Sequence, residues 1–223
     1  GVARIMDGLN NNGGFLLMDE PGLGKTTTAM AAIVANGGER NLIVVPTGGK
    51  DNQKANWQET ADLYNIDVID GAPESGDQSG TFVVSYDELY DDNGQLREEF
   101  LAGFDMVAFD ESHNMSNPES KAAQAGKELQ EVCDKALYLS ATPFSHVADM
   151  HYMTKLGLFK DNEDFASFVQ SIGGSVFTDK ETGELRVGGR ESNPPDVLAR
   201  MAAIMHVDGF ALRHNADLTG RSD

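Results

Sequence analysis

The stretch that decides the fold is FLLMDEPGLGKTTTAM, residues 15–30. It begins with a short apolar run at residues 15–18, which is typical of a strand buried on both faces. Proline and glycine then break the extended chain at residues 21–24. The run that starts at Lys25 predicts a helix ending near Asn36-Gly37-Gly38. Strand, glycine turn and helix in this order have the geometry of a phosphate-binding loop.

The chemistry expected of this turn is the binding of a nucleoside triphosphate with Mg²⁺. Free N–H groups and the positive dipole end at a helix start attract an anion. Lys25 is expected to reach the β- and γ-phosphates, and the Thr26 hydroxyl to bind Mg²⁺. The predicted nucleotide-binding residues are Gly22, Leu23, Gly24, Lys25, Thr26 and Thr27. The alternative is a tight turn and helix without a ligand, and Asp19 stands where the pattern G-x-x-x-x-G-K-[ST] has its first glycine.

Composition narrows the classes of partner. The chain has 223 residues, of which 40 % are hydrophobic, so it can bury a full core. A net charge of −19 argues against a broad nucleic-acid-binding face, but it leaves room for a narrow groove of backbone amides and hydroxyls. No apolar run approaches the roughly 20 residues that cross a bilayer, so no membrane partner is expected. The lone Cys133 favours an intracellular, reducing compartment, and the start at Gly1 favours a piece of a longer protein.

The rest of the chain alternates strand-like and helix-like runs. Strands are expected at residues 41–45, 65–69, 81–84, 106–109 and 136–139, and helices at residues 53–64, 92–102 and 118–132. This alternation predicts an α/β fold with a mostly parallel sheet covered on both faces. Beyond it we expect helices at 146–156, 162–171 and 194–206, and a β-hairpin at 174–188.

Polar residues follow the predicted strands and should line one edge of the sheet. They are Asp19-Glu20, Pro46-Thr47, Ser85-Tyr86, Asp110-Glu111 and Ser140-Ala141-Thr142.

The acidic pair Asp110-Glu111 is the second half of the expected ATP site. Asp110 directly after a buried strand is expected to hold Mg²⁺, and Glu111 to polarise an attacking water. With Lys25 these two residues form the predicted catalytic set, and Thr26 and Asp110 are the predicted metal ligands. His113 follows on the same loop and is expected to link the ATP site to another element. Ser140 and Thr142 follow the next strand, within expected reach of His113, and are expected to sense the γ-phosphate, so the three residues form the predicted coupling set.

Taken in order, these motifs resemble those of the first, N-terminal RecA-like motor domain of superfamily 2 helicases and translocases. DEPGLGKT (19–26) resembles motif I, VVPTG (44–48) motif Ia, VVSYDEL (83–89) motif Ib, DESH (110–113) motif II and SATP (140–143) motif III. Asp19 before the glycines, the segment after motif II and Trp57 resemble the Swi/Snf-type branch. The tail from Ser140 onward looks similar to strawberry notch proteins and related phage or mobile-element helicases.

The resemblance implies a three-layer RecA-like domain over residues 1–144 and an extension of helices and a β-hairpin over residues 145–223. It also implies a second RecA-like motor domain outside this sequence, which would make the present chain a half-site with weak turnover alone. Nucleic-acid contacts are expected from Pro46, Thr47, Gly48, Ser85 and Tyr86. DNA is favoured over RNA as the partner, and Lys50 and Lys54 are candidates for added charge there.

Three functions are compatible with these residues. The first is an ATP-dependent helicase or translocase. The second is a regulatory P-loop module without motor activity, which the acidity keeps open. The third is a ParA-type partitioning ATPase, whose loop resembles Gly24-Lys-Thr-Thr-Thr-Ala29, although Asp19 replaces the extra lysine of that class.

Overall fold

The computed structural model describes residues 1–212 except 21, 144, 190–191 and 194. Pro21, Phe144, Pro194 and residues 213–223, which figure in the predictions above, lie outside the described residues. The helices are α1 (Val2–Asn12), α2 (Lys25–Asn36), α3 (Lys50–Asp62), α4 (Lys121–Val132), α5 (Asn162–Ser171) and α6 (Pro195–Val207). The strands are β1 (Gly14–Leu17), β2 (Arg40–Val45), β3 (Val68–Asp70), β4 (Gly80–Ser85), β5 (Phe104–Phe109), β6 (Cys133–Leu139), β7 (Val176–Thr178), β8 (Leu185–Val187) and β9 (Ala211–Leu212). Short 3₁₀ turns lie at Tyr86–Glu88, Glu98–Phe100, Ser112–Met115, Val147–Tyr152 and Thr154–Leu156.

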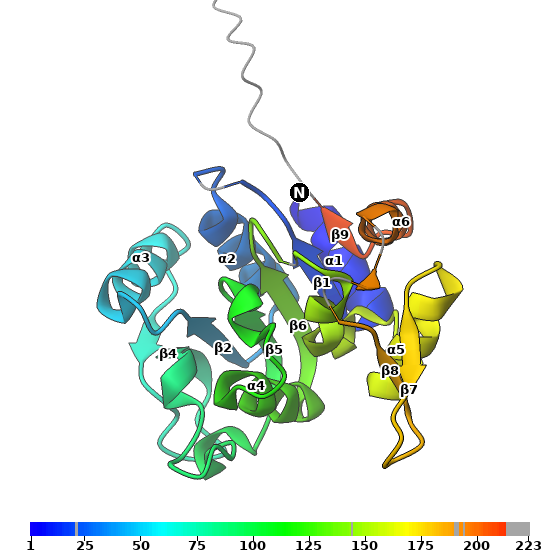
Figure 1. Ribbon diagram of the computed structural model, residues 1–223. Coiled ribbons are helices and arrows are strands. Elements are labelled where there is room, and N and C mark those ends of the chain that lie inside the picture. The colour runs from blue at the N-terminus through cyan, green and yellow to red at the C-terminus, as the bar shows by residue number, and fades with distance from the viewer. Residues whose placement is uncertain (21, 144, 190–191, 194, 213–223) are drawn as a thin grey trace, which may run out of the picture.

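A seven-stranded sheet in the order β3-β4-β2-β5-β6-β1-β9 forms the centre of the molecule (Figure 1). Every pairing within it is parallel among the described residues. Parallel strands joined by helices place the carboxyl ends of all strands at the same edge. The predicted α/β fold with a mostly parallel sheet is therefore confirmed.

Alternating side chains of the strands divide the core into two clusters. On one face Phe15, Ile43 and Leu137 pack with side chains of α1, α2 and α3. On the other face Leu16 and Tyr138 pack with side chains of α4, α5 and α6. Because neighbours along a strand point to opposite faces, both halves of each apolar run are buried. The result is the expected three-layer arrangement of helices, sheet and helices.

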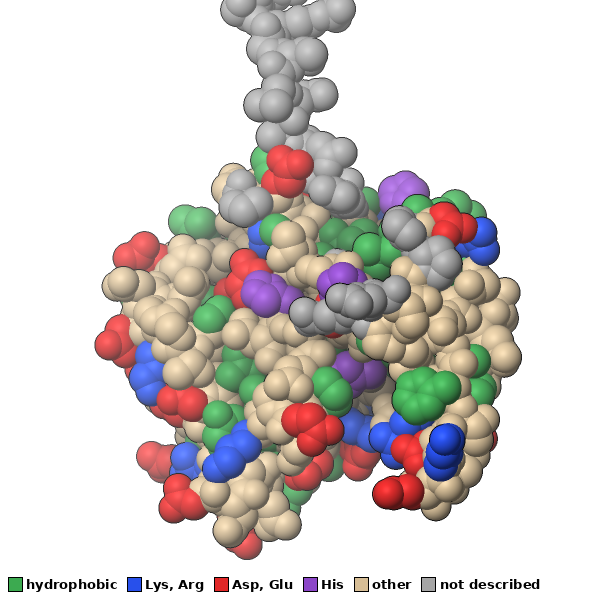
Figure 2. Space-filling model, viewed as in Figure 1, with side chains coloured by type: hydrophobic (Ala, Val, Ile, Leu, Met, Phe, Trp, Pro, Cys, Tyr) green, Lys and Arg blue, Asp and Glu red, His purple; other side chains and the backbone are tan. Residues whose placement is uncertain are grey.

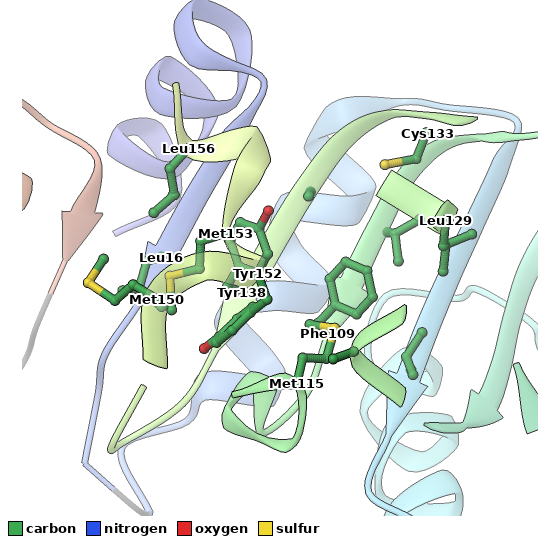
Figure 3. Close-up of a cluster of buried hydrophobic side chains, with 14 of the residues drawn as sticks. Leu16, Phe109, Met115, Leu129, Cys133, Tyr138, Met150, Tyr152, Met153 and Leu156 are labelled. Carbon is green, nitrogen blue, oxygen red and sulfur yellow. The ribbon is translucent and has the colours of Figure 1, made fainter. Parts of the chain in front are cut away.

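The second face also binds the chain beyond residue 145 to the sheet (Figure 3). Tyr138 of β6 stacks on Phe109 of β5 with ring centroids 5.8 Å apart, and Tyr152 meets Tyr138 edge-on at 6.1 Å. Met150 and Met153 of the same 3₁₀ region are fully buried in this cluster. The segment after the last predicted motif thus completes one apolar layer rather than forming a separate core.

One predicted helix is wrong. Residues 92–102 hold a turn and a single 3₁₀ turn at Glu98–Phe100 instead of a helix. The Asp91 carboxylate accepts hydrogen bonds from the backbone N–H groups of Asn93 and Gln95. Gly94 has φ +84°, a left-handed conformation that ends any regular helix at this point.

Other elements shift or were not predicted. The strand expected at residues 65–69 occupies Val68–Asp70, because Asn65 adopts φ +54° and starts the strand late. The helix expected from residue 118 begins at Lys121, where the Ser120 side chain caps it. The stretch 146–156 forms two 3₁₀ turns rather than one helix. The sequence analysis missed α1 and the two-residue edge strand β9. The helices α5 and α6 and the hairpin β7–β8 are confirmed.

The close contact between β1 and the later segment gives a prediction for stability. A Cβ atom added to Gly14 would lie 2.4 Å from the carbonyl oxygen of Lys155, a backbone atom that cannot rotate away. We expect Gly14→Ala to lower the free energy of unfolding by about 1–3 kcal/mol, as overpacking does in other cores. Urea denaturation measures this change.

The matched control is Gly189→Ala, since Gly189 is exposed and an added Cβ there meets no atom within 4 Å. Equal stability of both variants would show that a Cβ atom at position 14 does not clash with the Lys155 carbonyl.

Candidate functional site

The polar residues that follow five strands meet at one edge of the sheet, as expected for parallel strands. Backbone hydrogen bonds link the ends of neighbouring strands: the Asp110 N–H donates to Val44 at 2.8 Å, and the Ser140 N–H donates to Leu17 at 3.1 Å. These bonds bring the end of β5 beside β2, and the end of β6 beside β1. Asp110 and Ser140 therefore lie on the same edge as the glycine turn that follows β1.

The glycine turn has an anion-binding conformation. Gly22 and Gly24 adopt φ +83° and +76°, and Gly24 occupies the N-cap position of α2. No side chain caps the N-terminus of α2 within the described residues, so its first N–H groups remain available to a phosphate. A Cβ added to either glycine meets no atom within 4 Å, so the space beside the loop is open. The Lys25 Nζ atom donates to the Asp19 carbonyl at 2.7 Å, which holds the lysine along the loop.

Asp110 is an almost buried carboxylate, with 7 % of the residue exposed. Its Oδ2 atom accepts a hydrogen bond from the Trp57 indole N–H at 3.0 Å, and its Oδ1 atom accepts one from the Glu111 backbone at 3.0 Å. Burial raises the pKa of Asp110 above its ordinary value, and the bond from Trp57 opposes that rise. The carboxylate is thus fixed in orientation by donors on both oxygens.

Glu111 and His113 form the second polar group of the site. His113 Nδ1 lies 2.9 Å from the Ser140 hydroxyl and 3.3 Å from Glu111 Oε2. The hydrogen bond from His113 is the main reason that the pKa of Glu111 lies below its ordinary value. An ionised carboxylate that is half-exposed beside the phosphate loop can orient or deprotonate a water molecule.

The expected link between motif II and motif III is partly direct. Ser140 is fully buried and contacts His113, while Thr142 is exposed and its backbone N–H donates to the Ser140 hydroxyl at 3.2 Å. Thr142 therefore reaches His113 only through Ser140 in the described residues. Their role in sensing the γ-phosphate stays a prediction.

The donor set suits Mg²⁺ bound together with a nucleotide. In the described part of the chain no group of three or more His, Cys, Asp or Glu residues forms a metal cage. Mg²⁺ keeps several waters and binds through one or two protein oxygens plus substrate phosphates. The carboxylate of Asp110 and the hydroxyl of Thr26 supply that kind of set, and Thr26 stands at the start of α2 beside the loop.

Two of the residues expected to contact nucleic acid have buried side chains in the structure. Ser85 and Tyr86 are buried, with 0 % and 2 % of each residue exposed. The Ser85 hydroxyl donates within its own turn to Asp87 and Glu88, and the Tyr86 hydroxyl donates to the Asp110 carbonyl at 3.1 Å. A buried hydroxyl that is already bonded cannot reach a phosphate at the surface. The contact of these two side chains with nucleic acid stays a prediction, which this burial does not favour.

The turn after β2, residues 46–49, is accessible to solvent, as contact with nucleic acid would require. Thr47 and Gly48 are exposed and Pro46 is half-buried at the start of α3. Lys54 is not available there, because it is buried and bonded to Asp70 at 2.6 Å and Glu88 at 2.8 Å. Lysine and arginine side chains on the visible face are interspersed with acidic ones and form no basic patch (Figure 2). Any nucleic acid bound here would meet hydroxyl and amide groups rather than a field of positive charge.

Sequence reasoning missed one functional contact. Trp57 is fully buried, and its indole N–H donates to the predicted Mg²⁺ ligand Asp110. The signal available in the sequence was a single tryptophan in a polar helix, since a buried indole needs an acceptor.

Comparisons with known proteins agree with this geometry. A family model described as "P-loop containing NTP hydrolase pore-1" matches residues 5–179. RNA polymerase-associated protein RapA of Stutzerimonas stutzeri is 32 % identical over 154 residues, covering 61 % of this chain and 16 % of that protein. A SWI/SNF-related matrix-associated actin-dependent regulator of chromatin subfamily A-like protein 1 from Xenopus tropicalis is 28 % identical over 148 residues, covering 61 % of this chain and 15 % of that protein. The chain thus spans about a sixth of the length of these curated relatives.

Solved structures give the same answer for the fold. The Sulfolobus solfataricus SWI2/SNF2 ATPase core in complex with dsDNA matches with a TM-score of 0.67 and 19 % identity, over 97 % of this chain and 43 % of that one. The same ATPase core domain in a second structure matches with a TM-score of 0.65 and 20 % identity, over 98 % of this chain and 42 % of that one. The RecA-like fold is confirmed, and with the curated relatives the Swi/Snf-type resemblance is confirmed. The strawberry notch, phage and mobile-element resemblances of the tail stay predictions. No helix in the described part of the chain is long and apolar enough to cross a membrane.

The backbone of Glu111 gives a prediction for this site. Glu111 has φ +45°, in the left-handed region that costs residues with a Cβ about 1–2 kcal/mol relative to glycine. We expect Glu111→Gly to be more stable than Glu111→Ala by about 1 kcal/mol, since both remove the carboxylate and only glycine removes the strain. Urea denaturation of the two variants measures the difference.

Glu59, exposed in the middle of α3, is the matched control. There the order should reverse, because glycine in a helix is less stable than alanine by about 0.5–1 kcal/mol. The same order at both positions would contradict a strained Glu111.

Proposed function

Since the chain belongs to the family described as P-loop containing NTP hydrolase pore-1, we propose that it is the ATP-binding half of a motor that moves on nucleic acid. One observation carries the proposal: the phosphate loop, the buried Asp110 and the half-exposed Glu111 lie on one sheet edge beside the exposed turn at Thr47. ATP chemistry and a surface for nucleic acid therefore share the same strands.

The residues have distinct parts in hydrolysis. The amides at the start of α2 and the amine of Lys25 hold the phosphates, and Lys25 leaves the Asp19 carbonyl to do so. Thr26 and Asp110 would hold Mg²⁺, and the ion would supply positive charge that neutralises the phosphates. Glu111 orients and deprotonates the attacking water, and His113 keeps that carboxylate ionised and in place.

The proposed partner is DNA, with RNA as the alternative. Thr47 and Gly48 contact phosphates of the backbone through a hydroxyl and an amide, which read no sequence. One solved structure of similar fold, of which this chain covers 43 %, is a complex with dsDNA. This supports duplex DNA as the first ligand to test. The proposed site of action is intracellular.

We further propose a second RecA-like motor domain in the complete protein. The share of the solved core that this chain leaves uncovered supports a partner half of comparable size. That half would close over the nucleotide, so the present chain alone should turn over ATP slowly. In this proposal residues 1–144 carry the motor motifs and residues 145–223 are an extension of the same domain.

ATP hydrolysis tests the catalytic assignment. In the complete protein we expect Lys25→Ala and Glu111→Gln each to lower the rate of ATP hydrolysis at least about a hundredfold, because phosphate binding or water activation is lost. Phosphate release with saturating MgATP and duplex DNA measures the rate. The Glu111 variant should still bind MgATP, whereas the Lys25 variant should bind it weakly.

Normal turnover in either variant would refute the site. Turnover in the wild type that duplex DNA and RNA both fail to stimulate would favour the regulatory-module alternative over a motor.

The turn after β2 gives an independent test of the nucleic-acid face. We expect Thr47→Ala to weaken duplex DNA binding about fivefold, which corresponds to one lost hydrogen bond. The loss should be equal for two unrelated sequences, since a phosphate contact carries no sequence information. Fluorescence anisotropy with labelled duplexes measures both affinities.

Ser85→Ala is the matched control for Thr47→Ala. Ser85 carries a buried hydroxyl on the neighbouring strand, so its loss should reduce stability and leave DNA affinity within about twofold. A larger effect of Ser85→Ala than of Thr47→Ala on DNA affinity would overturn the assignment of this face.

A further inference from the structure

Helix α3 connects the proposed nucleic-acid turn to both proposed Mg²⁺ ligands. It begins at Lys50, directly after Thr47 and Gly48, and its interior residues reach the ATP site. Trp57 donates its indole N–H to Asp110 Oδ2 at 3.0 Å. The preceding residue, Asn56, places its amide 3.4 Å from the Thr26 hydroxyl.

The contact between Trp57 and Asp110 is rigid. Trp57 is fully buried against α2 and the strands of the same face, where Ala29 and Ile43 belong to its cluster. An indole packed in this way has one orientation, and its only polar atom needs an acceptor. Asp110 has no freedom to turn away, because its other oxygen accepts from the Glu111 backbone. A shift of α3 is therefore passed to the carboxylate.

A second strand end contacts the same residue. Tyr86, which follows β4, is buried and donates to the backbone carbonyl of Asp110 at 3.1 Å. The side chain of Asp110 is thus bound from α3 through Trp57. Its main chain is bound from motif Ia through Val44 and from motif Ib through Tyr86. The side chains of His113 and Ser140 contact Glu111 instead. The two acids of motif II are held by different parts of the protein.

We propose that Trp57 is a positioning residue that orients the metal-binding carboxylate of Asp110 and links the occupancy of the α3 turn by nucleic acid to Mg²⁺ binding. The proposal rests on the function proposed above. A rotation of α3 when its first turn binds a phosphate moves the indole and so the carboxylate, and displacements of this kind change catalysis strongly. The Mg²⁺ site and the nucleic-acid turn are then coupled reciprocally.

Trp57 is the only tryptophan in the sequence, so it reports on its own surroundings. Protein labelled with 5-fluorotryptophan should show one ¹⁹F resonance from this chain. We expect that resonance to move more on addition of MgADP than on addition of ADP with EDTA, and to move again when a blunt-ended DNA duplex is added. An Mg²⁺-independent shift would contradict the link to the metal site, and an unchanged resonance with bound duplex would contradict the link to nucleic acid.

Two replacements of Trp57 distinguish the effect of its N–H group from the effect of its ring size. Benzothienylalanine keeps the size of tryptophan and replaces the N–H group by sulfur, and Trp57→Phe is the genetically encoded counterpart. We expect each to raise the Mg²⁺ concentration for half-maximal tightening of ADP binding about tenfold or more, as removal of a group that supports a metal ligand does elsewhere. Binding of ADP in EDTA should stay within about twofold, because the phosphate loop is intact.

Glu59→Gln is the control on α3, since Glu59 is exposed on the same helix. Its Mg²⁺ midpoint should equal that of the wild type. A purely structural Trp57 would lower the melting temperature in the phenylalanine variant without moving the Mg²⁺ midpoint in either replacement, and that result would overturn the proposal. Failure of the wild type to bind ADP with or without Mg²⁺ would instead refute the proposed ATP site.

Discussion

The parallel pairing of β1, β6, β5, β2 and β4 is the constraint on which the site depends. Parallel neighbours need a crossover connection, here a helix or a longer loop with 3₁₀ turns, and each crossover returns the chain to the same starting edge. All polar residues after the strands are then delivered to the opposite edge, however far apart they lie in sequence. Lys25 and Asp110 are separated by 85 positions and still belong to one site. Their separation along the sheet is only the width of β6, which lies between β1 and β5.

The cost of this arrangement falls on Asp110. A carboxylate that is nearly buried loses most of its hydration, and burial without partners costs several kcal/mol. Two hydrogen bonds offset part of the cost, one from the indole of Trp57 and one from the backbone N–H of Glu111, and the positive charge of Lys25 adds a weaker attraction. Both hydrogen-bond donors are neutral, and a carboxylate oxygen held in this way is a ligand that suits a divalent metal. The same bonds fix the direction in which the carboxylate points.

The fold and the motif positions could be predicted because they depend on local patterns. Neighbouring residues in the sequence were enough to identify the apolar run before the glycine turn and the Asp110-Glu111 pair after β5. The roles of Ser85 and Lys54 could not be predicted in this way, because their partners are set by the turn at residues 85–88 and by the edge strand β3. The bond between Trp57 and Asp110 joins residues 53 positions apart, and periodicity carries no information on such a pair. The 3₁₀ turns between β6 and α5 could not be predicted for a related reason, because tertiary packing of Tyr152 and Met153 decides their conformation.

The acidity of the chain restricts how the proposed nucleic-acid partner can be attracted. A net charge of −19 repels a polyanion at long range, and the buried pairs of Lys54 remove one of the few cations near the turn after β2. If nucleic acid binds at this edge as proposed, short-range groups supply the attraction. The exposed turn offers the amides at the start of α3 and the side chain of Thr47, which also bonds Asp87. Such contacts are weak singly, so in the proposed motor the second half would hold the strand against them. Weak contact would suit the proposed translocation, because a motor has to release its track as it moves.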